Sequence, residues 1–255
     1  VLYTRTPALL STLLASGIPT ILELHQLPRR GKSAFVRQCN QAAIVACLTS
    51  AMKTILQEWG VREDRLIVEG DGVDLRRFTP LPSRESARAT LGITTSRPVV
   101  GYVGRLKTLG LEKGVGILIK ALSSADMMGL IVGGPENDRK EYEALAKNVG
   151  LTSEDIHFTG ALDSKDVPMA LAACDILTMP FPDFPHYRFH MSPLKMFEYM
   201  AAERPIITTD LPTIRDVLNE TSAYFCKPGD SIDLARVLQE ALAHPEEAEK
   251  RAAAA

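Results

Sequence analysis

The sequence predicts an α/β protein with parallel sheets. Short apolar runs alternate with segments whose apolar residues recur at helical spacing, most regularly after position 98. Such runs match strands buried on both faces, and the helices between them connect one parallel strand to the next. The composition fits a globular chain, because 45% of the 255 residues are hydrophobic and 24% are charged. Length and alternation together predict two α/β domains.

Residues 99–255 are predicted to form a Rossmann-like domain. Its strands are expected in the runs PVVGYV at 98–103, GLIVGG at 129–134, DIHFTG at 155–160, DILTMP at 175–180, PIITTD at 205–210 and SAYFC at 222–226. Its helices are expected to include 141–150, 166–174 and 233–242. This order of strands and helices predicts a sheet whose strands all run parallel.

Residues 1–80 are predicted to belong to another Rossmann-like domain. Strands are expected near 1–4, 19–24, 43–49 and 65–69, with a helix near 51–59. The apolar stretch ALLSTLLASGIP at 8–19 is too short to cross a bilayer and is interpreted as a buried helix. A sheet of three or four strands is small for an α/β domain. We therefore expect the amino-terminal part of this domain to be missing from the chain.

A linker is expected between the two domains. The segment FTPLPSRESARATLGITTSRP at 78–98 contains three prolines, several serines and threonines, and no long apolar run. We place the hinge at 81–98.

Charge and cysteine content bear on partners and location. The formal net charge of −2 gives no reason to expect nucleic acid as a partner. The cysteines at 39, 47, 174 and 226 include no C-x-x-C pair, which favours a reduced, cytoplasmic protein. The basic run RRGK at 29–32 is interpreted as a solvated loop. The alternative is a contact with a phosphorylated acceptor or the inner face of a membrane.

The first candidate site follows the strand at 99–103. In GRLKTLGLEKG at 104–114, Arg105 and Lys113 lie beside Gly104 and Gly114, at the carboxyl end of a parallel strand where α/β sheets bind ligands. These two cations could hold a diphosphate. The alternative is a solvated basic loop.

Two further segments could face the same edge. GGPEND at 133–138 begins with Gly133 and precedes a helix whose first amides could face an anion, although turn chemistry explains it equally well. In HMSPLKMFEYMAAERP at 190–205, Ser192 is predicted to cap a helix, and Glu198 lies within that largely apolar helix. A buried carboxylate needs a partner. Glu198 is therefore interpreted either as a ligand of sugar hydroxyls or as the partner of a core arginine.

Several other motifs are set aside. RGKS at 30–33 lacks the first glycine of a phosphate loop, because position 26 is Gln26. GVG at 114–116 lacks the last glycine of a dinucleotide fingerprint. His186 and His190 have a spacing that suits a metal on a helix, but neighbouring prolines favour a loop there. No D-x-D sequence is present to hold a divalent metal, and we expect no metal and no cofactor.

The order of these motifs resembles the donor domain of family 4 (group 1) retaining glycosyltransferases. The resemblance covers about 99–243 and rests on GRL and KG, then IVGGP, then FTG with DVPMALAACDILTMP, then SPLKMFEYMAAERPIITTDLP. ILELH at 21–25 and LIVEGDGVDLRRF at 66–78 resemble the last strands of that family's acceptor-side domain. The resemblance implies the GT-B fold, with two Rossmann-like domains facing across a cleft.

The resemblance also implies roles for individual residues. Arg105 and Lys113 would bind the donor diphosphate, Glu198 the ribose hydroxyls, and His25 would reach across the cleft toward the reacting sugar. The implied donor-binding residues also include Gly104, Gly133, His190, Met191, Ser192, Pro193 and Leu194. The donor would be a nucleotide-diphosphate sugar, and the acceptor a glycan, a lipid-linked molecule or a small molecule.

The sequence departs from the family pattern at three places. The family often has two glutamates eight residues apart, but the position eight before Glu198 is His190. Three additional residues separate Arg105 from Lys113, so the loop is expected to bulge. Glu203 takes a position after a helix where glycine and a left-handed backbone are usual. The alternatives to a transferase are a sugar-nucleotide epimerase or hydrolase, and a degenerate binding domain without activity.

Overall fold

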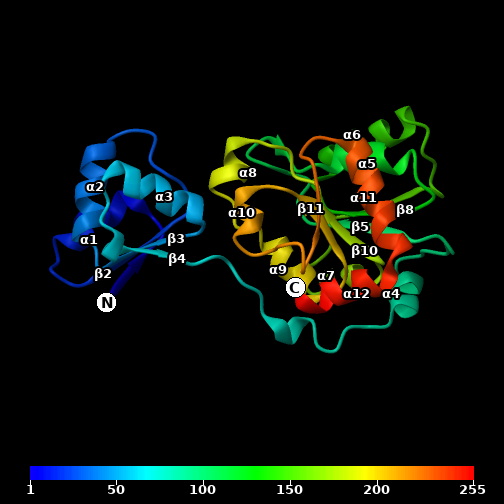
Figure 1. Cartoon of the computed structure of the whole chain (residues 1–255), viewed down its shortest axis with the longest axis horizontal. Helices are drawn as coiled ribbons and strands as arrows, with labels where there is room; N and C mark the ends of the chain where they lie inside the picture. The colour runs from blue at the N-terminus through cyan, green and yellow to red at the C-terminus, as the bar shows by residue number, and fades with distance from the viewer. The chain divides into compact units, whose positions relative to one another are not determined.

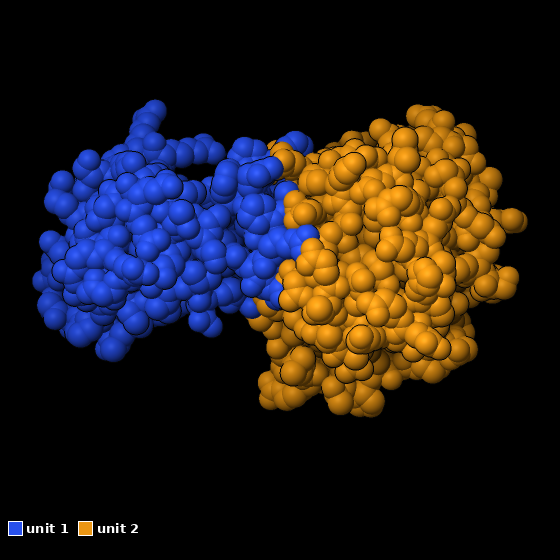
Figure 2. Space-filling model, in the orientation of Figure 1, with its two compact units in different colours: residues 1–71, 184–193, 211–217 blue, residues 72–183, 194–210, 218–255 orange.

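The computed structural model describes all 255 residues, which form two compact units. The first, blue in Figure 2, consists of Val1–Asp71, Phe184–Pro193 and Leu211–Val217. The second, orange in Figure 2, consists of Gly72–Asp183, Leu194–Asp210 and Leu218–Ala255. The division expected from the sequence differs from this one. It places residues 184–193 and 211–217 in the second domain, because they follow strands of that domain along the chain, whereas the structure places them in the first unit.

The second unit is built on a six-stranded parallel sheet. Its strands are β5 (Val99–Val103), β8 (Met128–Val132), β9 (Ile156–Gly160), β10 (Ile176–Met179), β11 (Ile206–Thr209) and β12 (Tyr224–Cys226). Their order is β12-β11-β10-β5-β8-β9, so the strand order reverses between β5 and β10. Figure 1 labels β11, β10, β5 and β8. All six expected strands are confirmed. Ligands of such sheets bind at the carboxyl ends beside the reversal, so the residues after β5 are well placed for binding.

Helices cover both faces of this sheet. They are α4 (Arg84–Thr90), α5 (Val115–Leu122), α6 (Glu136–Asn148), α7 (Val167–Ala172), α9 (Leu194–Ala201), α11 (Ser231–Ala243) and α12 (Pro245–Ala254). On β5, Val100 and Tyr102 belong to the buried core that includes α5 and α11. A side chain at Gly101 would instead meet Cys174, two residues after the end of α7. Because alternate strand residues point to opposite faces, α7 lies on the face opposite α5 and α11.

The segment expected to be a linker contains helix α4. The Ser83 side chain accepts a hydrogen bond from the Ser86 amide and so caps this helix. Arg84 and Arg88 form ion pairs with Asp175 at 2.9 and 2.5 Å, just before β10. These contacts attach α4 to the second unit.

The first unit contains a four-stranded parallel sheet in the order β1-β2-β3-β4. The strands are β1 (Leu2–Thr4), β2 (Thr20–Leu24), β3 (Ile44–Cys47) and β4 (Leu66–Val68). Its helices are α1 (Leu10–Leu14), α2 (Lys32–Gln41), α3 (Ser50–Trp59), α8 (Pro185–Phe189) and α10 (Pro212–Arg215). One-turn 3-10 helices lie at η1 (Pro7–Leu9), η2 (Glu63–Arg65) and, in the second unit, η3 (Leu75–Arg77). The strands expected near 1–4, 19–24, 43–49 and 65–69 and the helix near 51–59 are confirmed.

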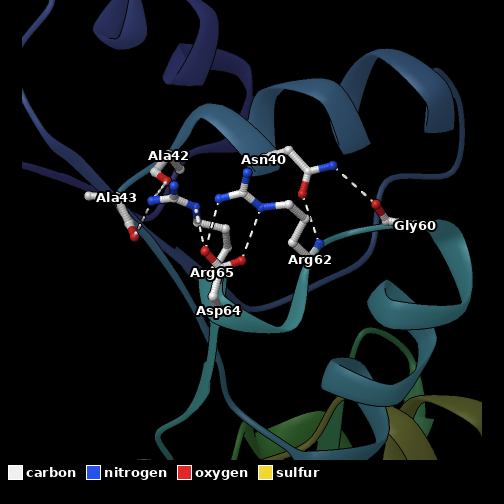
Figure 3. A network of polar contacts seen from close by, with 7 residues as sticks. All are labelled: Asn40, Ala42, Ala43, Gly60, Arg62, Asp64 and Arg65. Carbon is white, nitrogen blue, oxygen red and sulfur yellow. Dashed lines mark hydrogen bonds and ion pairs between the residues drawn. The ribbon is translucent and has the colours of Figure 1, made fainter.

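A polar network holds the turn that leads from α3 into β4 (Figure 3). The Asn40 side chain at the end of α2 donates to the carbonyl of Gly60 at 3.0 Å and accepts from the Arg62 amide at 2.8 Å. Arg62 in turn forms two hydrogen bonds with Asp64, at 2.9 and 3.0 Å. The network therefore ties the end of α2 to the chain between α3 and β4.

Two helix expectations are wrong. The stretch at 8–19 does not form one buried helix, since α1 has only five residues and Leu10 is its only buried residue. Gly17, at a φ of 70°, ends this stretch before β2. The segment around Pro185 is helical, not a loop, because Pro185 takes the first position of α8, where its missing N–H is tolerated.

Candidate functional site

A cavity of about 440 Å³ lies at the carboxyl ends of β5 and β8 in the second unit. Its wall combines the glycine turns after both strands with side chains of both charges. The lining residues are Val103, Gly104, Arg105, Lys107, Val132, Gly133, Gly134, Pro135, Ala161, Leu162, Val167 and Glu198. The volume falls in the range usual for small-molecule sites. The cavity is therefore the candidate ligand site of this unit.

Two glycines allow the backbone to pack closely at the base of this cavity. A side chain on Gly133 would begin 2.1 Å from the carbonyl oxygen of Gly104, a separation that no real side chain tolerates. A side chain on Gly104, whose φ is 138°, would begin 2.8 Å from Cε of Lys195. Close contact with backbone therefore requires glycine at position 133, and the φ of 138° favours glycine at position 104.

The tyrosine side chains of Tyr102 and Tyr199 hold the end of β5. The Tyr102 hydroxyl donates to the carbonyl of Arg105 at 2.7 Å. From α9, the Tyr199 hydroxyl donates to the carbonyl of Val103 at 3.0 Å and accepts from its amide at 2.7 Å. Burial raises the pKa of Tyr199, so it stays a protonated phenol. These bonds fix where the chain leaves the strand and enters the loop.

The loop between Arg105 and Lys113 folds as a small antiparallel hairpin, β6 (Lys107–Thr108) with β7 (Leu111–Glu112). Its turn residues, Leu109 and Gly110, have φ values of 54° and 75°, as in a type I′ turn. The bulge expected from the three additional residues is thus an ordered hairpin.

Of the three cationic residues on this loop, Lys107 has acidic partners, and Arg105 and Lys113 have none. Lys107 lies 2.5 Å from Glu141 and 3.7 Å from Asp138, so α6 neutralises it. Arg105 is exposed and Lys113 is partly buried, and neither forms an ion pair. Burial, together with the nearby charge of Arg105, lowers the pKa of Lys113 to about 8. Two cations without anionic partners therefore lie at this edge of the sheet.

Glu198 projects from α9 into the cavity wall. Its Oε1 lies 3.8 Å from Nη1 of Arg77, and 22% of its side chain is exposed. Burial raises the pKa of Glu198, and the positive charges of Arg77 and Lys195 partly oppose that rise. The carboxylate thus has an arginine neighbour and also faces the cavity, so each of the two interpretations of Glu198 has a contact that supports it.

Lys195, one turn earlier on α9, is a site residue that sequence reasoning missed. It is 6% exposed, and its Nζ has no hydrogen-bond partner. The Nζ lies 3.5 Å from the centre of the Tyr102 ring. The only sequence signal was a lysine among the apolar residues of PLKMFEYM, since helical spacing places it on the same side as Glu198.

The loop before α9 belongs to the first unit up to Pro193. The Ser192 hydroxyl accepts a hydrogen bond from the Asp71 amide at 2.9 Å, and α9 begins at Leu194, so Pro193 directly precedes it. Met191 is buried. His190 has a buried Nδ1 without a hydrogen-bond partner, and burial with the neighbouring His186 lowers its pKa. Donor binding by residues 190–194 stays a prediction.

His25 directly follows β2 in the first unit and lies in a polar cluster. Its Nε2 is 2.5 Å from Oε1 of Glu23 and 2.9 Å from Nε of Arg5. A single ring nitrogen either donates to the carboxylate or accepts from the guanidinium, so the tautomer of the His25 ring decides which of these bonds Nε2 makes. The cluster orients the ring at the carboxyl edge of the first sheet, and the role of His25 stays a prediction.

The chain contains neither a metal-binding cluster nor a membrane-spanning helix. No three His, Cys, Asp or Glu side chains lie close enough together to hold a metal ion. No helix combines the length and the apolar character needed to traverse a bilayer. All four cysteines are buried and free.

Comparison with known proteins defines the class of this protein. Residues 97–244 match the family described as glycosyl transferases group 1, and the chain belongs to this family. It is 30% identical over 215 residues to a 2-deoxystreptamine glucosyltransferase of Streptomyces kanamyceticus, covering 80% of the chain and 52% of the relative. The chain thus spans about half the length of that relative.

Two further proteins are similar. A GDP-mannose-dependent mannosyltransferase of Corynebacterium glutamicum, acting on a monoacylated phosphatidylinositol monomannoside, is 37% identical over 117 residues, 43% of the chain and 29% of that protein. The crystal structure of HepE from Anabaena with UDP and glucose has a TM-score of 0.77 at 21% identity, over 98% of the chain and 70% of that structure. The α/β fold with parallel sheets is that of GT-B glycosyltransferases.

Proposed function

We propose that this chain carries the donor site of a glycosyltransferase that uses a nucleotide-diphosphate sugar. The observation that carries the proposal is the pair Arg105 and Lys113, two neighbouring cations without ion-pair partners in the loop that follows β5. Arginine offers a fork of donors and lysine a point charge, which together suit a diphosphate. The family relationship, with a glucosyltransferase and a mannosyltransferase among its similar members, supports the same reaction class.

The other groups of the cavity suit the rest of such a donor. Glu198 lines the cavity and can accept hydrogen bonds from two ribose hydroxyls. Gly104 and Gly133 line the cavity, so the diphosphate could lie against their backbone at the strand ends. The amides at the start of α9 would add donors for a phosphate.

The reaction would proceed with retention of configuration and without a metal. The bond between the sugar and the diphosphate loosens first, and Arg105, Lys113 and the helix amides stabilise the charge that develops on the leaving group. The acceptor hydroxyl then forms the new bond on the same face of the sugar, and its proton passes to an oxygen of the departing diphosphate. His25 would act from the first unit on the reacting sugar.

Binding of a nucleotide-sugar donor is tested by thermal-shift assays and calorimetry with UDP-glucose and GDP-mannose. Binding of either one supports the proposal, and it should weaken strongly in Arg105→Ala. The matched control is Arg139→Ala, because the Arg139 guanidinium pairs with Glu136 and Glu143 and does not line the cavity. Absence of binding to every nucleotide sugar tested would contradict the proposal.

Product analysis separates transfer from the other activities. A nuclear magnetic resonance assay that finds the donor's anomeric configuration in the product, with turnover unchanged by a chelator, supports a retaining and metal-independent transferase. Release of free sugar or an epimerised nucleotide sugar without acceptor would favour the hydrolase or epimerase. Donor binding without any turnover in the full-length protein would favour a degenerate binding domain.

The acceptor and the location are part of the same proposal. The acceptor would be a glycan, a lipid-linked molecule or a small molecule, and the protein would act in the cytoplasm. The basic run at 29–32 precedes and enters α2, where it could contact a membrane surface. Sedimentation with anionic vesicles, compared between the wild-type chain and Arg29→Gln/Arg30→Gln, tests that contact.

A further inference from the structure

Lys195 is a lysine that the proposed mechanism does not use. Its side chain is 6% exposed and lies inside the second unit, below the loop that follows β5. Its Nζ makes no hydrogen bond and no ion pair. A buried polar group without a partner is unfavourable, which indicates that a ligand or a change of charge completes this position.

The position of Lys195 connects it to the donor cavity. The space where a side chain of Gly104 would begin is 2.8 Å from Cε and 3.0 Å from Nζ of Lys195. Gly104 lines the cavity. The amine therefore lies beside the backbone of Gly104, a residue of the cavity wall, so its charge would act on an anion bound in the cavity.

The groups around the amine disfavour a positive charge while the cavity is empty. Burial lowers the pKa of Lys195 well below its ordinary value, and the positive charge of Lys113 lowers it further. Glu198 on the same helix opposes this effect. The ring faces of Tyr102 and Phe181, at 3.5 and 5.7 Å from Nζ, offer an ammonium only partial compensation for lost water.

We propose that Lys195 is an uncharged amine in the empty site and takes up a proton when the donor diphosphate binds. The bound site then contains three cations, Arg105, Lys113 and Lys195, around one diphosphate. This inference rests on the proposed function. It adds a buried lysine that becomes charged when the donor binds, and a proton that is taken up together with the donor. The uptake also avoids the repulsion among three cations in the absence of donor.

The proton makes donor affinity depend on pH in a defined direction. Between the pKa of Lys195 in the empty site and its higher pKa in the complex, each donor brings one proton with it. Affinity then falls by up to roughly tenfold for each unit of rising pH. Lys113, with a pKa of about 8, contributes a similar dependence at higher pH, so the two lysines must be separated by substitution.

Calorimetry of the chain with UDP-glucose or GDP-mannose measures this proton directly. The diphosphate of a nucleotide sugar is esterified at both ends and does not itself titrate near neutral pH. Heats measured in two buffers of different ionisation enthalpy should give an uptake of roughly one proton per donor. Lys113→Arg, which keeps a permanent charge, should retain the uptake. Lys195→Met should abolish it and weaken binding by roughly tenfold or more.

The other possible results of the calorimetry would overturn either the role of Lys195 or the proposed function. Donor binding without proton uptake in the wild-type chain overturns the role of Lys195 and leaves the proposed function intact. Uptake that persists in Lys195→Met and disappears in Lys113→Arg assigns the proton to Lys113 and also overturns it. A chain that binds no nucleotide sugar overturns the proposed function and the coupling with it.

A measurement on the wild-type chain covers the case in which Lys195→Met does not fold. Carbon-13 labelling of lysine reports the charge of each amine through the resonance of its neighbouring Cε. The resonance of Lys195 should be that of a neutral amine at neutral pH without donor, and of an ammonium with donor. An ammonium resonance in the empty chain would contradict the inference.

Discussion

Replacing Glu198 by glutamine separates its two interpretations, because a ribose ligand and a structural ion-pair partner respond differently. Glutamine keeps the shape of the side chain and removes the charge. As a ribose ligand, the residue loses charge-assisted hydrogen bonds with the two hydroxyls. Nucleotide affinity should then fall by about 1–3 kcal/mol.

The structure indicates that the stability cost of Glu198→Gln is small. The distance of 3.8 Å from Arg77 is too long for a hydrogen bond, and 35% of the Arg77 side chain is exposed. Arg77 also donates to the carbonyl of Ser164, so it keeps a partner in the variant. An ion pair of this kind, screened by solvent, stabilises a protein by about 1 kcal/mol or less.

The raised pKa of Glu198 also indicates that Glu198→Gln costs little stability. Because burial raises this pKa in the folded chain, the folded state disfavours the charged carboxylate relative to the unfolded state. This group therefore lowers stability as pH rises through its unfolded pKa toward its folded pKa, and it costs nothing below both. Glutamine removes that cost, which offsets part of the lost ion pair.

Melting temperature and nucleotide affinity are measured on the same variant. Glu143→Gln is the matched control, because it removes a carboxylate that pairs with Arg139 at 2.5 Å and lies outside the cavity after β5 and β8. We expect lost affinity with a near-normal melting temperature in Glu198→Gln and unchanged affinity in Glu143→Gln. A large fall in melting temperature with intact affinity would refute the ribose assignment.

Four other substitutions test separate parts of the molecule. Arg105→Ala should weaken binding of a nucleoside diphosphate by about 1.5–3 kcal/mol, and unchanged binding by calorimetry would remove Arg105 from the site. Lys113→Met should weaken the same binding yet stabilise the chain at neutral pH by up to about 3 kcal/mol, because a pKa of about 8 against an unfolded value of 10.5 makes its charge unfavourable below both; chemical denaturation that shows lower stability would contradict this sign. His25→Ala should reduce turnover far more than donor affinity, and normal turnover at saturating donor would exclude it from the reaction. Glu203 has a φ of 51°, so Glu203→Gly should be more stable than Glu203→Ala by about 1 kcal/mol in the same unfolding assay.

The strands, and the edge at which the cavity lies, could be predicted from the sequence. Parallel strands in this fold are continuous apolar runs between turn residues, so runs such as PVVGYV and DILTMP identify β5 and β10 without knowledge of their neighbours. Arg105 is separated from the end of β5 only by Gly104, and this places it at the carboxyl edge by chain connectivity alone. The left-handed backbone at Glu203 was also predicted, because it depends only on how a helix ends.

Short helices and proline positions were less predictable. The apolar residues at 8–19 suggested a long buried helix, but burial depends on what packs against each face, and only Leu10 of α1 is buried. Pro185 suggested a loop, yet a proline is equally compatible with the first turn of a helix such as α8. In both cases, a local pattern fitted two structures and packing selected one.

The charge state of the site depends on the tertiary structure. The sequence shows Lys107, Lys113 and Lys195 as three lysines with the same ordinary pKa. In the fold, Lys107 meets two carboxylates of α6, Lys113 is partly buried near Arg105, and Lys195 lies beneath Gly104 without a partner. Desolvation and charge–charge interaction act through space and not along the chain. The residue types and their order were therefore determined by the sequence, while the fold alone decided which of these lysines is neutralised, which is exposed to a ligand and which is buried.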